Sequence, residues 1–403
     1  MTRHPLRPLL ALLGRPEVKA LVRAGLGVAR RLAPTRSHVV VTAFPDTEGN
    51  AVEVLRLLLA ADAAGDVVWL TEELDATGAA RALDLPSLPS RLRVVPKRSV
   101  AGLLAFLTAR LTFFTHGLYL SPAPPARKPV VNLWHGDGPK APLRDRRTTP
   151  PRATVLVSGT RRFGEIKARF LHVPLDDLLG VGNPRQDQLT RPVDDAALRT
   201  LGLDPARPFV AYLPTFRSSV TVGSRVGWQD TAASAAAYSS RDMLAGLVAG
   251  AREAGVQVLV KPHPLDAESY AAPGAVQVTS GQLDAAGVPL YALLGRSVAL
   301  VTDYSSVWTD YLTLDRPIGF VLHDLDDYVR GSRGLNVTDL GELLPGPSLL
   351  SPDDCVGFVK AAVHDPEEHA ELRAASARLI GLAAPGTSAA GGLLGELSRR
   401  GLL

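Results

Sequence analysis

Cysteine, long apolar runs and charge of one sign are all scarce in this sequence. Its single cysteine, Cys355, excludes a disulfide scaffold, a cysteine zinc site and an iron–sulfur cluster. No stretch approaches the roughly 18–20 uninterrupted apolar residues of a transmembrane helix. The apolar run Leu9–Leu13 is also short for a signal-peptide core, so we expect a cytoplasmic protein. A net charge of +4 over 403 residues is mild and does not indicate a nucleic-acid binder.

Familiar catalytic motifs are missing as well. The sequence contains no HExxH, Walker A or GxSxG pattern, so zinc-hydrolase, P-loop and serine-hydrolase functions have no support. Carboxylates and histidines nowhere cluster with the spacing of metal ligands. We therefore predict no cofactor and no structural metal, and we leave a modest effect of Mg²⁺ open.

What the sequence does contain is typical of a globular α/β protein. Hydrophobic residues make up 46% of the chain, and 36 glycines and 32 prolines imply many short elements. Strand candidates in the first half span 38–44, 66–70, 92–95, 111–115, 130–134, 154–158 and 178–181. Those in the second half span 208–213, 256–261, 275–278, 298–302 and 317–322. Helical segments lie at 50–64, 240–254, 290–294, 305–314, 353–364 and 366–382.

This alternation predicts two doubly wound, Rossmann-like domains with parallel sheets and a cleft between them. We place the first domain at residues 37–185 and the second at 186–385, because the stretch around 183–195 is polar and rich in turn residues. A basic segment, 1–36, precedes them, and a helical tail, 386–403, follows them.

The N-terminal segment has an amphipathic pattern. A helix from Val18 onward places apolar residues on one face and basic residues on another. The apolar face comprises Val18, Leu21, Val22, Val28 and Leu32, and the basic residues beside it are Lys19, Arg23 and Arg30. Such a helix either lies on an anionic membrane surface or packs on its own domain with a solvated basic face.

Loops at the ends of the predicted strands carry polar chemistry. His135 directly follows a strand and precedes Gly136, where backbone can approach a ligand and an imidazole can take a proton from a hydroxyl. The alternative is a turn histidine beside a capping aspartate, Asp137. Asp46 and Glu48 either cap the next helix or contact an acceptor, and His116 is placed to line the cleft.

The second half offers candidates for binding phosphate. Lys261 and His263 stand in a rigid Lys-Pro-His-Pro turn, and Ser305 and Ser306 open a helix whose N-terminus suits an anion. Arg217 can fork onto phosphate oxygens. The structural alternatives are a rigid connector, a helix cap and a surface charge.

Six blocks of the sequence stand out together. The first three are Trp134-His135-Gly136 with Lys140, Gly182-Asn183-Pro184-Arg185 with Asp187, and Pro214-Thr215-Phe216-Arg217. The other three are Lys261-Pro262-His263-Pro264, Thr302-Asp303-Tyr304-Ser305-Ser306 with Asp310, and Asp324 through Tyr328 to Arg333-Gly334. With these blocks the chain resembles the CDP-glycerol:poly(glycerophosphate) glycerophosphotransferase family, the teichoic-acid primases and polymerases of Gram-positive bacteria. The blocks span roughly residues 130–335 in the family's order. The chain departs from the family pattern at Asp137-Gly138-Pro139 and at Ser218.

The resemblance implies a GT-B architecture whose C-terminal domain binds a CDP-polyol donor. It also implies a lipid-linked acceptor, either an undecaprenyl-diphosphate-linked saccharide or a growing polymer, at the inner face of the cell membrane. The implied catalytic residues are His135 and His263. The implied donor-binding residues are Pro214, Thr215, Arg217, Lys261, Asp303, Ser305, Ser306 and Arg333. The acceptor-side candidates are Asp46, Glu48, His116, Asp137 and Lys140.

Several functions remain open at this point. The donor is CDP-glycerol or CDP-ribitol, and the chain adds either one unit or many. A GT-B sugar transferase would share the fold, but it would release a nucleoside diphosphate and form a glycoside instead of releasing CMP. A non-catalytic lipid- or polymer-binding protein would bind donor without turnover.

Overall fold

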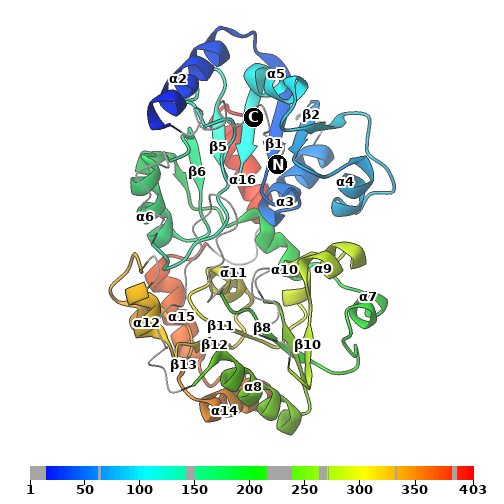
Figure 1. Ribbon diagram of the computed structural model, residues 1–403, viewed down its shortest axis with the longest axis vertical. Helices are drawn as coiled ribbons and strands as arrows, with labels where there is room; N and C mark the ends of the chain where they lie inside the picture. The colour runs from blue at the N-terminus through cyan, green and yellow to red at the C-terminus, as the bar shows by residue number, and fades with distance from the viewer. Residues whose placement is uncertain are drawn as a thin grey trace, which may run out of the picture.

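Two α/β domains stack along the long axis of the molecule (Figure 1). The computed structural model describes residues 15–61, 65–141, 150–215, 238–262, 270, 272–331, 334–383 and 388–403. Each domain is a parallel sheet flanked by helices, which confirms the predicted GT-B fold class.

The N-terminal sheet has seven parallel strands in the order β3-β2-β1-β4-β5-β6-β7. These strands are β1 (Arg36–Thr42), β2 (Val67–Thr71), β3 (Leu92–Pro96), β4 (Ala109–Phe114), β5 (Val130–Asn132), β6 (Val155–Val157) and β7 (Leu178–Leu179). Their near-continuous apolar runs are explained by burial on both faces, which parallel sheets require. Because β1, β4 and β5 are neighbours, the loops that follow them meet at one edge of the sheet.

Helices cover both faces of this sheet. They are α3 (Gly49–Ala60), α4 (Ala76–Ala82), α5 (Val100–Thr108) and α6 (Arg161–Leu171). The start of α3 is set by Glu48, whose carboxylate accepts from the amides of Asn50 and Ala51. This cap places Glu48 directly beside the loop that follows β1.

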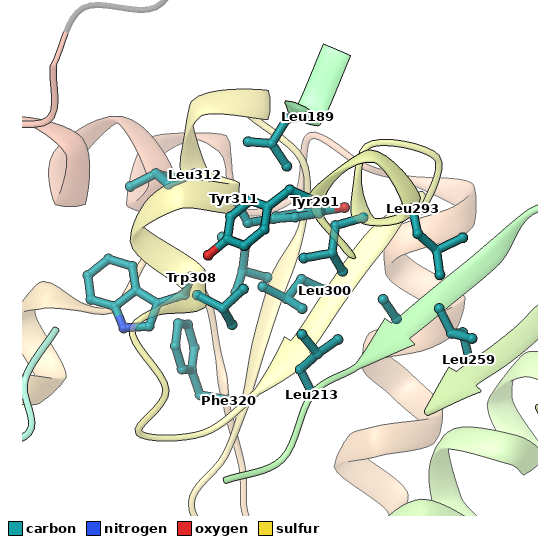
Figure 2. Close-up of a cluster of buried hydrophobic side chains, with 14 of the residues drawn as sticks. Leu189, Leu213, Leu259, Tyr291, Leu293, Leu300, Trp308, Tyr311, Leu312 and Phe320 are labelled. Carbon is teal, nitrogen blue, oxygen red and sulfur yellow. The ribbon is translucent and has the colours of Figure 1, made fainter. Parts of the chain in front are cut away.

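The C-terminal sheet has six parallel strands in the order β10-β9-β8-β11-β12-β13. They are β8 (Phe209–Tyr212), β9 (Gln257–Val260), β10 (Ala275–Gln277), β11 (Ala299–Thr302), β12 (Ile318–Val321) and β13 (Ser348–Leu349). The helices here are α7 (Asp195–Thr200), α8 (Ser240–Ala254), α9 (Ser280–Ala286), α10 (Leu290–Leu294), α11 (Val307–Tyr311), α12 (Leu325–Gly331), α13 (Leu340–Leu343), α14 (Pro352–His364) and α15 (Ala370–Ile380). Figure 2 shows the core under α11, where Trp308 and Tyr311 pack over Leu300 and Phe320.

The C-terminal helix α16 (Ala389–Arg399) belongs to the core of the N-terminal domain and is not the separate tail that we predicted. Leu393 and Leu397 are fully buried against the N-terminal sheet. The helix is held by the 3₁₀ turn η3 (Pro184–Thr190), because the Asp187 carboxylate accepts from the amide of Ala389 at 2.7 Å. The chain therefore crosses between the domains a second time near its end (Figure 1).

Helix α2 (Pro16–Leu32) packs on its domain, but through its basic side chains and not through the apolar face that the packed alternative required. Arg30 is fully buried over the ring of Phe106, and Arg23 donates to the carbonyl of Ser121. The apolar stripe faces solvent instead, with Leu21 75% and Leu32 79% exposed. Basic side chains thus attach this helix to its domain, and its apolar face is left uncovered. Within the described ranges, no helix is both long and apolar enough to cross a membrane.

Candidate active site

The loop after β5 is held in an unusual backbone conformation. Trp134 has φ of 54°, which L-residues other than glycine, asparagine and aspartate seldom adopt. Two asparagines hold it there. The Oδ1 of Asn132 accepts from the Trp134 amide at 2.9 Å, and Nδ2 of Asn50 donates to its carbonyl at 3.2 Å. The sharp turn that results presents His135 at the edge of the sheet.

The imidazole of His135 is fixed on three sides. Its ring stacks on Trp134, with centroids 4.5 Å apart, and on His116, with centroids 4.1 Å apart. It also hydrogen-bonds the backbone carbonyl of Thr115, which requires an N–H donor on the ring. The ring's other nitrogen is then the acceptor in the neutral imidazole.

Burial among protein groups and nearby cations together lower the pKa of His135 well below its usual value. Burial is the largest cause, followed by the positive charges of His116, Arg185 and Lys167. The residue is recessed, yet its side chain remains exposed to solvent. His135 is therefore neutral near pH 7, in the state that a general base requires.

The two domains meet at this loop. A Cβ on Gly136 would collide with Oγ of Ser306, and a Cβ on Gly138 would lie only 2.8 Å from Cβ of Ser306. The hydroxyl of Thr309 donates to the carbonyl of Asp137 at 2.9 Å. The structure thus brings the His135 loop of one domain against the Ser305–Ser306 loop of the other.

The donor-side residues within the described ranges lie at neighbouring strand ends. Thr215, Lys261 and Ser305 follow β8, β9 and β11, which are adjacent in the sheet. The backbone amide and hydroxyl of Thr215 both donate to the buried carboxylate of Asp303, at 2.7 and 3.0 Å, so Asp303 ties two of these loops together. Burial lowers the pKa of Lys261, against the opposing effect of the Asp284 carboxylate. Pro214 is buried at the end of β8, whereas Arg217, His263 and Arg333 lie outside the described residues.

Most acceptor-side candidates have partners within the protein. The Asp46 carboxylate accepts from the backbone amides of residues 72–74. Asp137 is fully buried, and its carboxylate accepts from Lys167, the Gly159 amide and Asn183. Lys140 forms a backbone bridge to Leu335 of the other domain. The structure places Asp137 behind the site, because its carboxylate does not reach solvent. Among these candidates, His116 stacks on His135.

Arg185 is a site residue that our list of candidates omitted. From η3 it donates to the His135 carbonyl at 2.9 Å, to Glu48 at 3.4 Å and to Asp310 at 2.7 Å. Tyr291 also donates to Asp310, at 2.8 Å, and lies under the guanidinium. Arg185 and Asp310 both belong to the sequence blocks quoted above, and this membership could have identified them as site residues. Their buried network joins the two domains directly behind His135.

Within the part of the chain that the structure describes, no group of three or more histidine, cysteine, aspartate or glutamate side chains is arranged to hold a metal ion. Cys355 is buried in the C-terminal core, and burial raises the pKa of its thiol to about 12. The domain junction itself brings the loop that carries the neutral His135 against Ser306.

Two α/β domains with parallel sheets, packed together at their strand ends, define the GT-B fold. The chain belongs to the CDP-Glycerol:Poly(glycerophosphate) glycerophosphotransferase family, whose sequence profile matches residues 28–382.

Three relatives illustrate the similarity. Over 233 residues the chain is 24% identical to the teichoic acid glycerol-phosphate primase of Bacillus spizizenii, covering 54% of this chain and 56% of the primase. Over 252 residues it is 28% identical to the teichoic acid poly(glycerol phosphate) polymerase of Staphylococcus epidermidis, covering 55% of this chain and 32% of the polymerase. The solved wall teichoic acid polymerase TagF superposes with a TM-score of 0.70 at 19% identity, over 96% of this chain and 97% of that one. The matches thus span about half or less of the two curated relatives, and the structural likeness concerns the fold.

Proposed function

We propose that this chain transfers glycerol phosphate from CDP-glycerol to a hydroxyl of a lipid-linked acceptor and releases CMP. The observation that carries the proposal is the neutral His135, in the loop whose Gly136 and Gly138 lie against Ser306 of the opposite domain. Family membership supports the donor class. A TagF variant solved after soaking with CDPG supports it further.

In this mechanism His135 accepts the proton of the acceptor hydroxyl as its oxygen bonds to the glycerol-bearing phosphorus. The bond from that phosphorus to the bridging pyrophosphate oxygen breaks, and CMP leaves with the electron pair. His135 keeps the proton until it is lost to solvent. Such transfers depend mainly on positioning and electrostatics. We assign charge stabilisation to Lys261 and the hydroxyls of Ser305 and Ser306, together with the predicted Arg217 and His263.

We also propose the anionic inner face of the cell membrane as a partner, because a lipid-linked acceptor must be reached there. The uncovered apolar face of α2 supports this proposal. Val100 and Leu104 on α5, the helix against which α2 packs, are exposed as well. Arg15 and Arg31 stay exposed at the two ends of this helix, and their charges favour an anionic surface.

A product assay tests the proposed reaction. The chain is incubated with CDP-glycerol or CDP-ribitol and a lipid-linked disaccharide analogue, and nucleotide and product mass are measured. We expect CMP and an acceptor heavier by one or more glycerol phosphate units. Addition of ribitol phosphate would show that the donor is CDP-ribitol instead of CDP-glycerol. A nucleoside diphosphate with a glycoside, or binding without turnover, would contradict the proposal.

A further inference from the structure

Four rings form a column at the edge of the N-terminal sheet. Phe44, His116 and His135 follow β1, β4 and β5, which are neighbours in the sheet. Phe44 meets His116 edge-on at 5.8 Å, and His116 lies nearly parallel to His135, with an interplanar angle of 15°. Trp134 closes the other side of His135. His135 is thus sandwiched by an indole from its own loop and an imidazole from the adjacent strand end.

Thr115 connects both histidines. Its Oγ1 lies 3.0 Å from Nδ1 of His116 and accepts the Phe44 amide proton at 3.2 Å. Because Oγ1 accepts from Phe44, its own proton points to Nδ1 when His116 is neutral. The carbonyl of the same residue accepts from the His135 ring. Thr115 is fully buried, so a fixed point in the core sets the orientation of both rings.

We propose that His116 is a positioning residue for His135. Its ring presses the His135 imidazole flat against Trp134, in the tautomer whose unprotonated nitrogen faces the acceptor hydroxyl. This inference rests on the proposed role of His135 as the base. Orientation by a neighbouring group is what makes an imidazole an effective base, and here a stacked ring and a backbone carbonyl supply it in place of a carboxylate.

His116 also acts on His135 through charge. The cations facing His135 are His116, Arg185 and Lys167. Arg185 is already paired with Asp310 and Glu48, and Lys167 with Asp137. A positive charge on His116 therefore opposes protonation of His135 and extends the pH range in which the base is active.

Two substitutions separate the ring from its charge. His116→Phe keeps a flat ring and removes the ionisable group, and His116→Ala removes both. The matched control is His364→Phe, at an exposed position on α14 in the other domain. We expect His116→Ala to lower kcat by about 10–100-fold, the cost of a misplaced catalytic group, with the KM for CDP-glycerol within about twofold. We expect His116→Phe to keep kcat within about fivefold, and the control to match the wild type.

The pH dependence distinguishes positioning from a merely structural role. In His116→Phe one cation fewer opposes protonation of His135, so its pKa rises. The acidic limb of kcat/KM should then move to higher pH by about half to one unit. Titration of the histidine rings by NMR, with His135 assigned from a His135→Gln variant, should show the same rise without any turnover.

The inference is overturned if His116→Ala has wild-type kcat with an unchanged His135 titration. It is also overturned if His116→Phe and His116→Ala lose activity equally while that titration stays fixed. If the wild type releases no CMP but the ring titration moves as expected, the proposed reaction fails and the positioning of His135 by His116 stands.

Discussion

At the scale of single residues, Arg185 connects the two domains at the site. It reaches Asp310 in one domain, Glu48 in the other and the backbone of His135 between them. A buried ion pair is weak evidence for stability, but removing one partner leaves uncompensated charge in the core. Arg185 thus contributes both to the stability of the contact between the domains and to the position of His135.

Arg185→Met should lower the free energy of unfolding by about 3–5 kcal/mol, because Asp310 and Glu48 lose their cation. It should also lower the rate of CMP release, since the His135 carbonyl loses a donor. Urea unfolding and a CMP assay measure the two effects. The control is Arg161→Met, which breaks an exposed pair with Glu165 worth about 1 kcal/mol or less. Equal stability changes in the two variants would contradict the account of Arg185.

We expect the stability of the folded protein to depend on pH through Glu48. Burial raises its pKa to about 7, against the opposing charge of Arg185. Between the usual pKa of glutamate and pH 7, the folded state holds a proton that the unfolded state has lost. Stability therefore falls as pH rises through this window. Glu48→Gln has no such proton to lose, so its stability does not fall in this way. Its free energy of unfolding, relative to that of the wild type, should rise by about 2–3 kcal/mol between pH 4 and pH 8. Denaturant unfolding at both pH values checks this, and a pH-independent difference would show that Glu48 ionises normally.

At the scale of elements, α16 shows how a distant segment completes a domain. Its buried leucines fill the N-terminal core, and Asp187 in η3 caps its first turn. The helix therefore stabilises the N-terminal domain and the second crossing between the domains.

Leu397→Ala should lower the free energy of unfolding by about 2–5 kcal/mol, the usual cost of a large-to-small change in a core. Leu379→Ala on α15 is the matched control, because that leucine is 50% exposed. Thermal or denaturant unfolding compares them. A change at Leu397 no larger than that at Leu379 would mean that α16 is a dispensable tail.

Because its apolar face is exposed, we expect helix α2 to contact the membrane through leucine and valine more than through arginine. Removing residues 1–36 would uncover the groups that bury Arg30, so point substitutions are the cleaner test. Leu21→Asp with Leu32→Asp should weaken sedimentation with anionic liposomes by about tenfold or more, since each leucine contributes roughly 1.5 kcal/mol or more on burial. Leu372→Asp with Leu379→Asp, at half-exposed positions on α15, is the control. Equal liposome binding by both double variants would show that the membrane contact lies on another surface.

At the scale of the whole molecule, local sequence patterns predicted the two sheets and missed the long-range contacts that complete the domains. Apolar runs bounded by turn residues located the strands, and the rule that ligands bind at parallel strand ends placed the His135 loop. Helices α4 and α5 were not predicted because they are short and show little periodicity, and the amphipathic 11-residue α6 was missed. The return of α16, the burial of Arg30 and the pairing of Asp137 with Lys167 are long-range contacts that no local pattern encodes.

The central claim is that the site is divided, with the base on the N-terminal domain and the donor held by the C-terminal one. The most direct test measures CDP-glycerol affinity and CMP release side by side in His135→Ala and Lys261→Ala. We predict that His135→Ala lowers turnover by about 10²–10⁴-fold, the usual contribution of a general base, with donor affinity nearly unchanged. Lys261→Ala should weaken donor binding. Near-normal turnover by folded His135→Ala, or loss of donor affinity in that variant alone, would contradict the account.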